Sequence, residues 1–366
     1  MDSLQHQIAL TLVPQIGAVT AKTLVSYCGS AEAVFSTSKS GLLKIPGIGP
    51  AVVDALKSTA PLEQAARELV FMEQQQVQAV FYTDAQYPAR LRQCQDGPAL
   101  FYFKGNDLSL LHGPRIVAIV GTRKPSEHGK AICEHIVADF LPYNVLIVSG
   151  LAFGVDVTAH RKATAMGIPN IGVLGHGLNS IYPYDHRSAA ARMVENGGLI
   201  SEYSHLAKPD REHFPMRNRI ISGLSDLVLV IETASSGGSM ITVQCAERQG
   251  REIFVIPGRP NDPHSVGCNW LLKNERAKLA ECAEDIASRM QWNPPGTTQP
   301  IQKQLFIELS AEEEKIVQIV RDTPEIPIDQ LSVAAACSPG LLASHILALE
   351  FKGVLRTLPG KRYSLC

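Results

Sequence analysis

The sequence predicts an α/β protein in which a doubly wound parallel sheet is flanked by a helical N-terminal domain and a small C-terminal domain. Short β-branched runs alternate with stretches of helical length between residues 115 and 258. Residues 1–60 show helical patterns around glycine turns, and residues 305–366 show three amphipathic helical patterns. The chain has 366 residues, of which 45% are hydrophobic and 19% charged, as expected of a globular protein with two or three domains.

The N-terminal region contains a weak internal repeat. VPQIGAVTAKTL and IPGIGPAVVDAL each place an Ile-Gly turn before a helix, and the second segment resembles a helix-hairpin-helix. Gly47 and Gly49 allow a tight turn whose backbone N–H groups can point at a phosphate. A plain helical hairpin packed on its neighbour explains the same pattern, because glycine-rich turns between helices are common.

The central region contains six apolar runs that predict buried parallel strands joined by crossover helices. They are RIVAIVG, VLIVSG, NIGVLG, GLISEY, LVLVIET and EIFVIPG. In such a sheet, ligands bind beyond the carboxyl ends of the strands. Residues 291–304 are rich in Pro, Gln and Thr and predict a linker. The following three helices and a short hairpin at Pro359-Gly360 predict a winged helix-turn-helix over residues 305–366.

The composition excludes several classes of protein. No segment has the apolar length of a membrane span, and the N-terminus lacks a basic region followed by an apolar one, so we expect a cytoplasmic protein without membrane association. The eight cysteines form no CxxC pair, which favours reduced thiols, and we expect neither a metal nor a cofactor. Residues 115–279 carry 18 Lys and Arg against 15 Asp and Glu, and only this region is basic.

The first predicted strand ends in Gly121-Thr122-Arg123-Lys124, just before a helix. This is not a GxGxxG dinucleotide fingerprint. A glycine, a hydroxyl and two cations at the start of a helix suit a phosphate held by backbone N–H groups and by a bidentate Arg123. Alternatively, Arg123 is only a solvated side chain at the edge of the sheet.

The other strand ends carry further small or polar residues. The second strand ends in Ser149-Gly150, and the later Asp156 and His160 form either an acid–base pair or structural hydrogen bonds. The loop GHGLNSIYPYDHR follows the third strand, and its two glycines permit a close backbone approach. SSGGSMIT, with Gly237, Gly238 and Ser239, is a second candidate anion site at the start of a helix.

The segment HFPMRNRIISGLSD places Arg217 and Arg219 in the first turn of a predicted helix, where the helix dipole disfavours cations. A bound phosphate would offset this cost, since a helix N-terminus attracts anions and arginines add bidentate donors. Phe214 then offers a face on which a base can stack. The alternative places Phe214 in the core and uses Asn218 as a local cap.

Six of these segments occur in a fixed order: IVGTRKPSEHGK, VSGLAFGVDVTAH, GHGLNSIYP, FPMRNRIISGLSD, SGGSMIT and FVIPGRP…SVGCNWLL. Together they resemble the motifs of the DNA processing protein A (DprA/Smf) family, and the resemblance covers essentially the whole chain. It implies a sterile-alpha-motif-like domain with the helix-hairpin-helix turn over residues 1–65 and an extended Rossmann-like domain over residues 66–290. After the 291–304 linker it implies the winged helix of residues 305–366.

The resemblance also implies a function and a set of contacts. Such proteins are non-enzymatic, bind incoming single-stranded DNA during natural transformation, form homodimers through the Rossmann domain and help to load a RecA-type recombinase in the presence of single-strand-binding protein. The phosphate-contacting arginine of the family falls on Arg123, beside Gly121 and Thr122, and the basic loop falls on Lys208 to Arg219. Some members have a lysine where this chain has Tyr184, so that contact either passes to Arg187 or is absent.

Two other functions fit parts of the sequence. A related family of phosphoribohydrolases carries PGGxGTxxE, but this chain has Gln244 where the essential glutamate belongs, and an amide cannot act as a general base. A duplex-reading regulator would use the winged helix, but its recognition helix PGLLASHILALEF carries no Lys or Arg. Only Arg356, Lys361 and Arg362 of the wing suit phosphates, so contact with a protein is the better expectation for this domain.

Overall fold

The computed structural model describes residues 3–293, 309–323, 326–352, 354–358 and 362–365, and the chain forms two compact units, Met1–Pro295 and Gly296–Cys366. The break between the units lies within the stretch 291–304 that was expected to be a linker, most of which is outside the described residues. Each unit has its own hydrophobic core.

The first unit begins with six helices, which are α1 Ser3–Leu12, α2 Ala18–Cys28, α3 Ala31–Ser36, α4 Lys39–Leu42, α5 Pro50–Leu56 and α6 Ala60–Gln75. Gly49 is the N-cap of α5, and Gly47 has a φ of +80°, a backbone conformation that favours glycine. Ile45 and Ile48 bury the turn between α4 and α5 against the core. Helix α6 runs without a break through residue 65, where the boundary of the helical domain was expected.

The rest of this unit is built on a nine-stranded sheet in the order β1-β2-β6-β5-β4-β3-β7-β8-β9. The strands are β1 Gln78–Phe81, β2 Leu100–Gly105, β3 Ile116–Val120, β4 Leu146–Ser149, β5 Asn170–Leu174, β6 Gly197–Ser201, β7 Leu227–Val230, β8 Glu252–Val255 and β9 Lys278–Leu279. The six predicted parallel strands are confirmed as β3 to β8. The antiparallel pair β1 and β2 and the two-residue strand β9 at the sheet edge were not predicted from the sequence.

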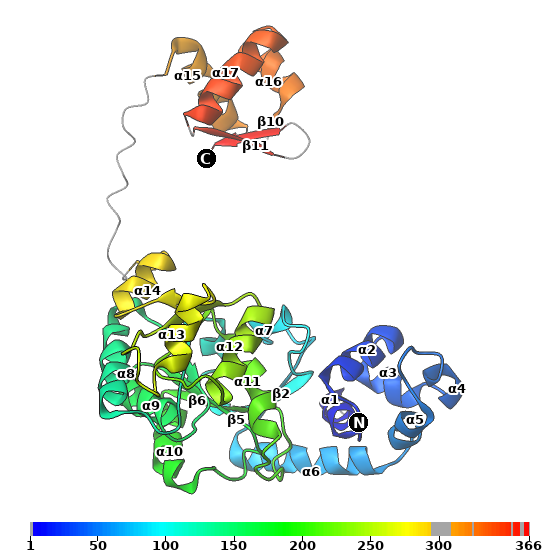
Figure 1. The fold of residues 1–366 in the computed structure, drawn as a ribbon. Helices are drawn as coiled ribbons and strands as arrows, with labels where there is room; N and C mark the ends of the chain where they lie inside the picture. Colours follow the sequence, from blue (N-terminus) through cyan, green and yellow to red (C-terminus); the bar gives the residue numbers. More distant parts are fainter. Residues whose placement is uncertain (1–2, 294–308, 324–325, 353, 359–361, 366) are drawn as a thin grey trace. The chain divides into compact units, whose positions relative to one another are not determined.

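Helices cover both faces of the sheet, as expected for a doubly wound fold (Figure 1). Val117 and Ile119 of β3 face one layer of helices, whereas Ala118 and Val120 face the other. The first layer contains α8 Glu127–Asp139, α9 Val155–Ala165, α10 Arg187–Glu195 and α14 Ala283–Arg289. The second contains α11 His213–Leu224, α12 Gly238–Arg248 and α13 Val266–Lys273, with the short α7 Ala89–Arg92 nearby. Three short 3₁₀ helices are η1 Leu108–His112, η2 Leu141–Tyr143 and η3 Tyr184–His186.

The order of the strands places a topological switch point beside β3. From β3 the chain adds β4, β5 and β6 on one side and then returns through α11 to add β7 and β8 on the other side. The carboxyl ends of these strands therefore meet at one edge of the sheet, next to the N-terminus of α11. In doubly wound folds this edge is where ligands bind.

The second unit has the helices and hairpin expected of a winged helix. Its elements are α15 Ala311–Asp322, β10 Ile326–Pro327, α16 Ile328–Ala335, α17 Pro339–Phe351, β11 Leu355–Leu358 and β12 Arg362–Leu365. Strand β10, which the sequence analysis did not predict, pairs with β12 to complete a three-stranded sheet. The Ser310–Glu313 capping box starts α15, and Lys352 pairs with the Glu313 carboxylate at 2.7 Å.

Within the described ranges, no single helix has both the length and the apolar character needed to cross a membrane, although α16 and α17, bent by 103°, pass that test as a pair. The seven described cysteines are free thiols. No group of three or more His, Cys, Asp or Glu side chains in the described part of the chain could hold a metal ion.

Candidate nucleic-acid interface

An arginine and two aromatic rings lie together at the carboxyl edge of the sheet. The Arg123 guanidinium, just after β3, lies 6.0 Å from the centre of the Phe214 ring at the start of α11. The Tyr182 ring lies 5.7 Å from Phe214 at an angle of 34°, and Tyr182 is 50% exposed. We call Arg123, Tyr182 and Phe214 the edge cluster. It combines a solvent-exposed cation with apolar ring faces, which is the combination that single-stranded nucleic acids bind.

A second set of exposed rings surrounds the loop that follows β5. Arg187 stacks over the Tyr184 ring at 4.0 Å, and both side chains are exposed. Phe153 is exposed in the loop before α9 and packs edge-on against the buried His186 at 4.8 Å. The loop that carries Phe153 adjoins the loop that carries Arg123, because the backbone N–H of Val155 donates to the Thr122 carbonyl at 3.2 Å.

The start of α8 is not the phosphate site that the sequence suggested. The Glu232 carboxylate, which is buried, accepts hydrogen bonds from the Ser126 N–H at 2.9 Å and from the Ser126 hydroxyl at 2.5 Å. The Ser126 hydroxyl in turn caps the Gly129 N–H at 2.9 Å. An internal carboxylate therefore occupies the end of the helix where an anion would bind. Arg123 and Lys124 remain exposed beside it.

Arg217 lies inside the protein, which corrects the expectation that it contacts a phosphate directly. Its side chain is 4% exposed, and its guanidinium donates to the carbonyls of Gly150, at 2.6 Å, and Val173. Burial lowers the pKa of Arg217 to about 10, while the Asp156 carboxylate acts in the opposite direction. A guanidinium held in this way joins the ends of β4 and β5 to α11 and cannot extend into solvent.

Arg219, Asn218 and Ser239 also have internal partners. The Arg219 guanidinium pairs with the Glu202 carboxylate and donates to the Asp96 carbonyl. The buried Asn218 amide accepts from Arg217 at 3.0 Å and donates to the Gly238 carbonyl at 3.1 Å. The Ser239 hydroxyl shares a hydrogen bond of 2.7 Å with Thr233. Arg219 and Asn218 fix α11 to its neighbours, and Ser239 holds the start of α12 to the loop after β7. The prediction that these three side chains face a ligand is corrected.

Ser149 and Gly150 are likewise buried. The Ser149 hydroxyl donates to the Ile119 carbonyl at 2.6 Å, and the Gly150 N–H donates to Asp156 at 3.1 Å. Asp156 and His160 do not form an acid–base pair, because the His160 Nδ1 instead meets the Asn170 side chain at 2.9 Å. Burial lowers the pKa of His160 to about 4, so its ring is neutral near pH 7. The structural alternative for Asp156 and His160 is therefore correct.

Two predicted loops remain accessible. Lys208 is exposed in the segment before α11, which is anchored by the stacked rings of Tyr203 and His213 at 4.0 Å. Gly237 and Gly238 are exposed at the start of α12, where Gly237 has a φ of +135° and no side chain caps the helix. The start of α12 thus differs from the start of α8, which Glu232 occupies. The first N–H groups of α12 can donate hydrogen bonds to an anion.

Glycines bring the loops of this edge close to one another. A Cβ on Gly121 would meet the Val155 Cβ at 2.9 Å, so the Thr122 loop packs directly on the start of α9. A Cβ on Gly175 would meet the Phe214 ring at 3.0 Å. The positions of Arg123 and Phe214 in the edge cluster therefore depend on Gly121, which was predicted to be part of a phosphate site, and on Gly175, which was predicted to allow close backbone approach.

Comparison with known proteins agrees with the resemblance of the sequence motifs. The family model described as DNA recombination-mediator protein A matches residues 78–291. The chain belongs to this family, which is also named DprA/Smf. The model of the DprA winged helix domain matches residues 302–361.

Curated members of the family and solved structures resemble the chain over much of its length. Protein Smf of Escherichia coli is 33% identical over 305 residues, covering 82% of this chain and 80% of that protein. DNA processing protein DprA of Bacillus subtilis is 37% identical over 234 residues, covering 64% and 78%. The crystal structure of DprA from Streptococcus pneumoniae superposes with a TM-score of 0.68 at 31% identity, covering 80% of this chain and 99% of that chain. DprA from Helicobacter pylori, a structure described for its single-stranded DNA binding mode, gives 0.54 at 28% identity, covering 60% and 98%.

The family motifs led to Arg123 and Phe214 but not to all their neighbours. Tyr182 and Phe153 were not singled out from the sequence. A usable signal existed, since both rings stand in glycine-containing loops directly after strands, where apolar side chains have little core to join. Arg187 was named only as a substitute for a missing lysine, and it is exposed at this edge.

Proposed function

We propose that this DprA/Smf family member binds single-stranded DNA along the carboxyl edge of its sheet and acts there as a non-enzymatic recombination mediator. The observation that carries the proposal is the edge cluster, in which the Arg123 guanidinium lies 6.0 Å from the Phe214 ring and the half-exposed Tyr182 ring lies 5.7 Å from the same ring. An arginine beside aromatic rings can neutralise a phosphate while a base stacks on a ring, and neither contact depends on the base sequence. The relative from H. pylori, whose structure is described for single-stranded DNA binding, supports the same ligand.

The proposed path of the strand uses exposed cations and glycines, the half-exposed Tyr182 and the partly buried Phe214. Phosphates contact Arg123, Lys124, Lys208 and Arg187, and the uncapped start of α12 at Gly237-Gly238 offers one further phosphate site. Bases stack on Phe214 and Tyr182. The buried Arg217 and Asn218 and the partly buried Arg219 hold the backbone beneath this path and act as positioning residues.

The remaining parts of the proposal concern partners. By family membership we infer a homodimer formed through the Rossmann domain, loading of a RecA-type recombinase, action together with single-strand-binding protein, and a place in the cytoplasm. The winged helix is proposed to contact protein, since α17 exposes Leu341, Leu347 and Phe351 and carries no Lys or Arg. Light scattering at tens of micromolar, with and without DNA, tests the dimer.

A hydrolase of the phosphoribohydrolase type is the main competing function. Its loop would correspond to the start of α12, where the exposed Gln244 stands in place of the required glutamate. The amide has no basic oxygen of suitable pKa and cannot take up a proton from water. Incubation with nucleoside monophosphates should release no free base, and release would contradict the non-enzymatic proposal.

The deciding experiment compares the affinity of the full chain for a mixed-sequence oligonucleotide in single-stranded and duplex form, across a series of salt concentrations. We expect tighter binding of the single strand and a linear fall of log K with log salt. Equal or weaker binding of the single strand would contradict the proposal, because ring faces at the edge cluster are useful only for unpaired bases.

A further inference from the structure

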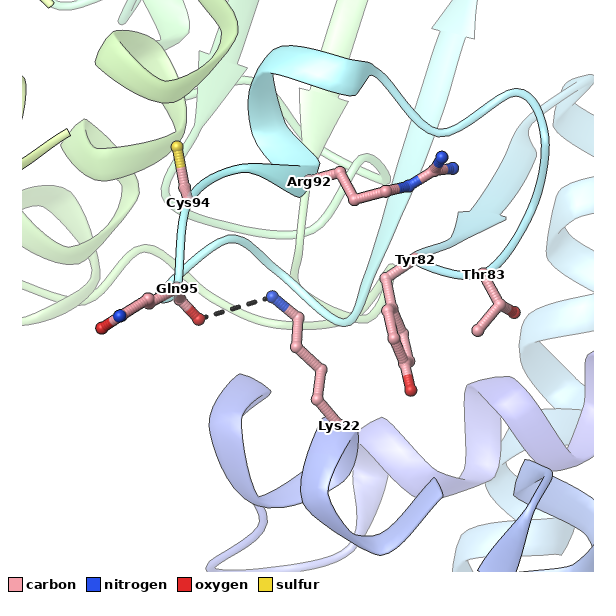
Figure 2. Close-up of a pocket in the computed structure, with 6 residues that line it drawn as sticks. All are labelled: Lys22, Tyr82, Thr83, Arg92, Cys94 and Gln95. Carbon is pink, nitrogen blue, oxygen red and sulfur yellow. Dashed lines mark hydrogen bonds between the residues drawn. The ribbon is translucent and has the colours of Figure 1, made fainter. Parts of the chain in front are cut away.

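A cleft lies between the N-terminal helices and the sheet domain, within the same compact unit but apart from the edge cluster. Its volume is about 540 Å³, and α2 forms one wall while the segment after β1 forms the other (Figure 2). Six residues line it: Lys22, Tyr82, Thr83, Arg92, Cys94 and Gln95. A volume of this size lies within the range of small-molecule sites.

The Lys22 ammonium extends across this cleft without an ion-pair partner among the described residues. It reaches the Gln95 carbonyl oxygen at 3.5 Å and lies 5.8 Å from the centre of the Tyr82 ring (Figure 2). Burial and the nearby Arg219 both lower the pKa of Lys22. Asp96 acts on Lys22 only at longer range, and its carboxylate accepts from Gln249 at 3.3 Å. A half-buried ammonium of this kind is stabilised by an anion.

The opposite wall contributes a second cation and neutral donors. Arg92 is exposed, and among the described residues it donates to two carbonyl oxygens, those of Asp84 at 2.6 Å and Tyr87 at 3.4 Å. Burial raises the pKa of Tyr82, so its hydroxyl stays protonated and its ring presents a neutral apolar face. None of the six lining residues is a carboxylate. The cleft therefore combines two positive charges, a threonine hydroxyl and one aromatic ring.

We propose that this cleft binds the phosphate group of one nucleotide, held by Lys22 and Arg92, with the base against the Tyr82 ring. Two cations suit the dianion of a terminal phosphate better than the single charge of an internal phosphodiester. Such a phosphate belongs either to a free nucleoside monophosphate or to the 5′ end of a DNA strand. Only the second source rests on the proposed function.

The experiment measures binding to the full chain in two arms. Calorimetric titration with thymidine 5′-monophosphate, thymidine and inorganic phosphate tests the free nucleotide. Fluorescence anisotropy compares a thymidine oligonucleotide with a 5′ phosphate against the same oligonucleotide with a 5′ hydroxyl. We expect the monophosphate, the 5′-phosphorylated strand or both to bind more tightly than the unphosphorylated counterpart. Lys22→Gln and Arg92→Gln should each reduce that preference on the order of tenfold, the loss of one charge-assisted hydrogen bond.

The controls separate this site from the edge cluster. Lys44→Gln removes an exposed lysine from the same helical domain and should leave the preference unchanged. Binding of the 5′-hydroxyl strand reports the edge cluster alone, so its loss would contradict the proposed function and not this inference. Absence of any preference for phosphorylated ligands in the unmodified chain would overturn the cleft proposal. Equal affinity for inorganic phosphate and thymidine 5′-monophosphate would overturn the contact with Tyr82.

Discussion

Arg217 donates a hydrogen bond to the carbonyl oxygen of Gly150 at 2.6 Å, across 67 positions of the chain. The same glycine donates its N–H to Asp156 at 3.1 Å, so the end of β4 is held from both sides by opposite charges. Arg217 is thus a structural element of the binding edge. This arrangement explains why a cation stands near the start of α11, where the helix dipole disfavours it.

The first prediction concerns the stability that Arg217 provides. Arg217→Ala removes the donor of two buried carbonyls and the positive charge that offsets the buried Asp156 carboxylate, so the free energy of unfolding should fall by about 3–5 kcal/mol. Arg217→Lys keeps the charge but loses the planar guanidinium, so its free energy of unfolding should lie between those of the alanine variant and the unmodified chain. Urea denaturation measures both. An alanine variant of unchanged stability that binds DNA weakly would favour the direct phosphate contact that the sequence suggested.

A glycine substitution tests the same contact from the other side. A Cβ on Gly150 would lie 2.6 Å from the Arg217 Cζ and 2.6 Å from an Asp156 carboxylate oxygen. Gly150→Ala should therefore lower the free energy of unfolding by about 1–3 kcal/mol. Gly238→Ala is the matched control, since nothing lies within 4 Å of its added Cβ. Equal stability of the two variants would contradict the close packing around Gly150.

The second prediction concerns phosphate contacts at the edge. Arg123→Ala and Arg187→Ala should each weaken binding of all single-stranded sequences about equally. Each should also lower the slope of log K against log salt concentration (the salt slope) by roughly 0.7, the value for one lost phosphate contact on a single strand. Affinities measured at several salt concentrations give this slope. Unchanged affinity and slope for Arg123→Ala would remove the phosphate site on which the proposed function depends.

The matched control for Arg187 lies on the same helix. Arg192 is exposed in the last turn of α10, at the end that leads into the start of β6 and away from the carboxyl edge. Arg192→Ala should therefore keep the affinity and salt slope of the unmodified chain. A fall in slope as large as that of Arg187→Ala would mean that the strand does not follow the carboxyl edge.

The third prediction separates stacking from charge. Phe214→Ala should cost on the order of 1–3 kcal/mol of binding free energy and leave the salt slope nearly unchanged, because a stacked base releases no counterions. The measurement is the same salt series with a variant whose folding is checked by circular dichroism. A folded variant that binds as tightly as the unmodified chain would assign the ring to packing against Gly175 and Tyr182.

The fourth prediction assigns DNA binding to the first unit. A chain ending at residue 292 keeps the edge cluster and loses the acidic winged helix, so its affinity for single-stranded DNA should stay close to that of the full chain. Anisotropy with both proteins at equal salt measures this. A folded, truncated chain without affinity would make the winged helix a primary DNA site.

The fifth prediction follows from the buried His160, whose pKa falls from 6.5 to about 4 on folding. The unfolded chain protonates His160 more readily than the folded chain does. The contribution of His160 to the free energy of unfolding is therefore complete above about pH 6.5 and is lost as the pH falls towards 4. The loss should be about 3 kcal/mol in the free energy of unfolding. Urea denaturation across this range should show that the free energy of unfolding of His160→Gln depends less on pH than that of the unmodified chain. The variant of the exposed His128, His128→Gln, should follow the unmodified chain. Parallel curves for His160→Gln would contradict the neutral buried ring.

Much of the fold follows from local patterns in the sequence. The runs from RIVAIVG to EIFVIPG are continuous and β-branched because their strands are buried on both faces, and they were predicted as β3 to β8. Strands β1 and β9 lie at the two edges of the sheet and were missed, since β1 is buried over only half its length and β9 has only two residues. The motifs that carry the resemblance to the family lie mostly in the loops that follow β3 to β8.

What the sequence by itself determined is the order of the elements, the family and the edge of the sheet where ligands bind. Only the tertiary structure decided which polar residues at that edge face solvent. Glu232 fills the start of α8 from 106 positions away, and Arg217 turns inward to Gly150, although both neighbourhoods read as anion sites. The physical reason is that backbone conformation follows from residues within a few positions. The burial of a charged side chain instead depends on distant partners that satisfy its hydrogen bonds.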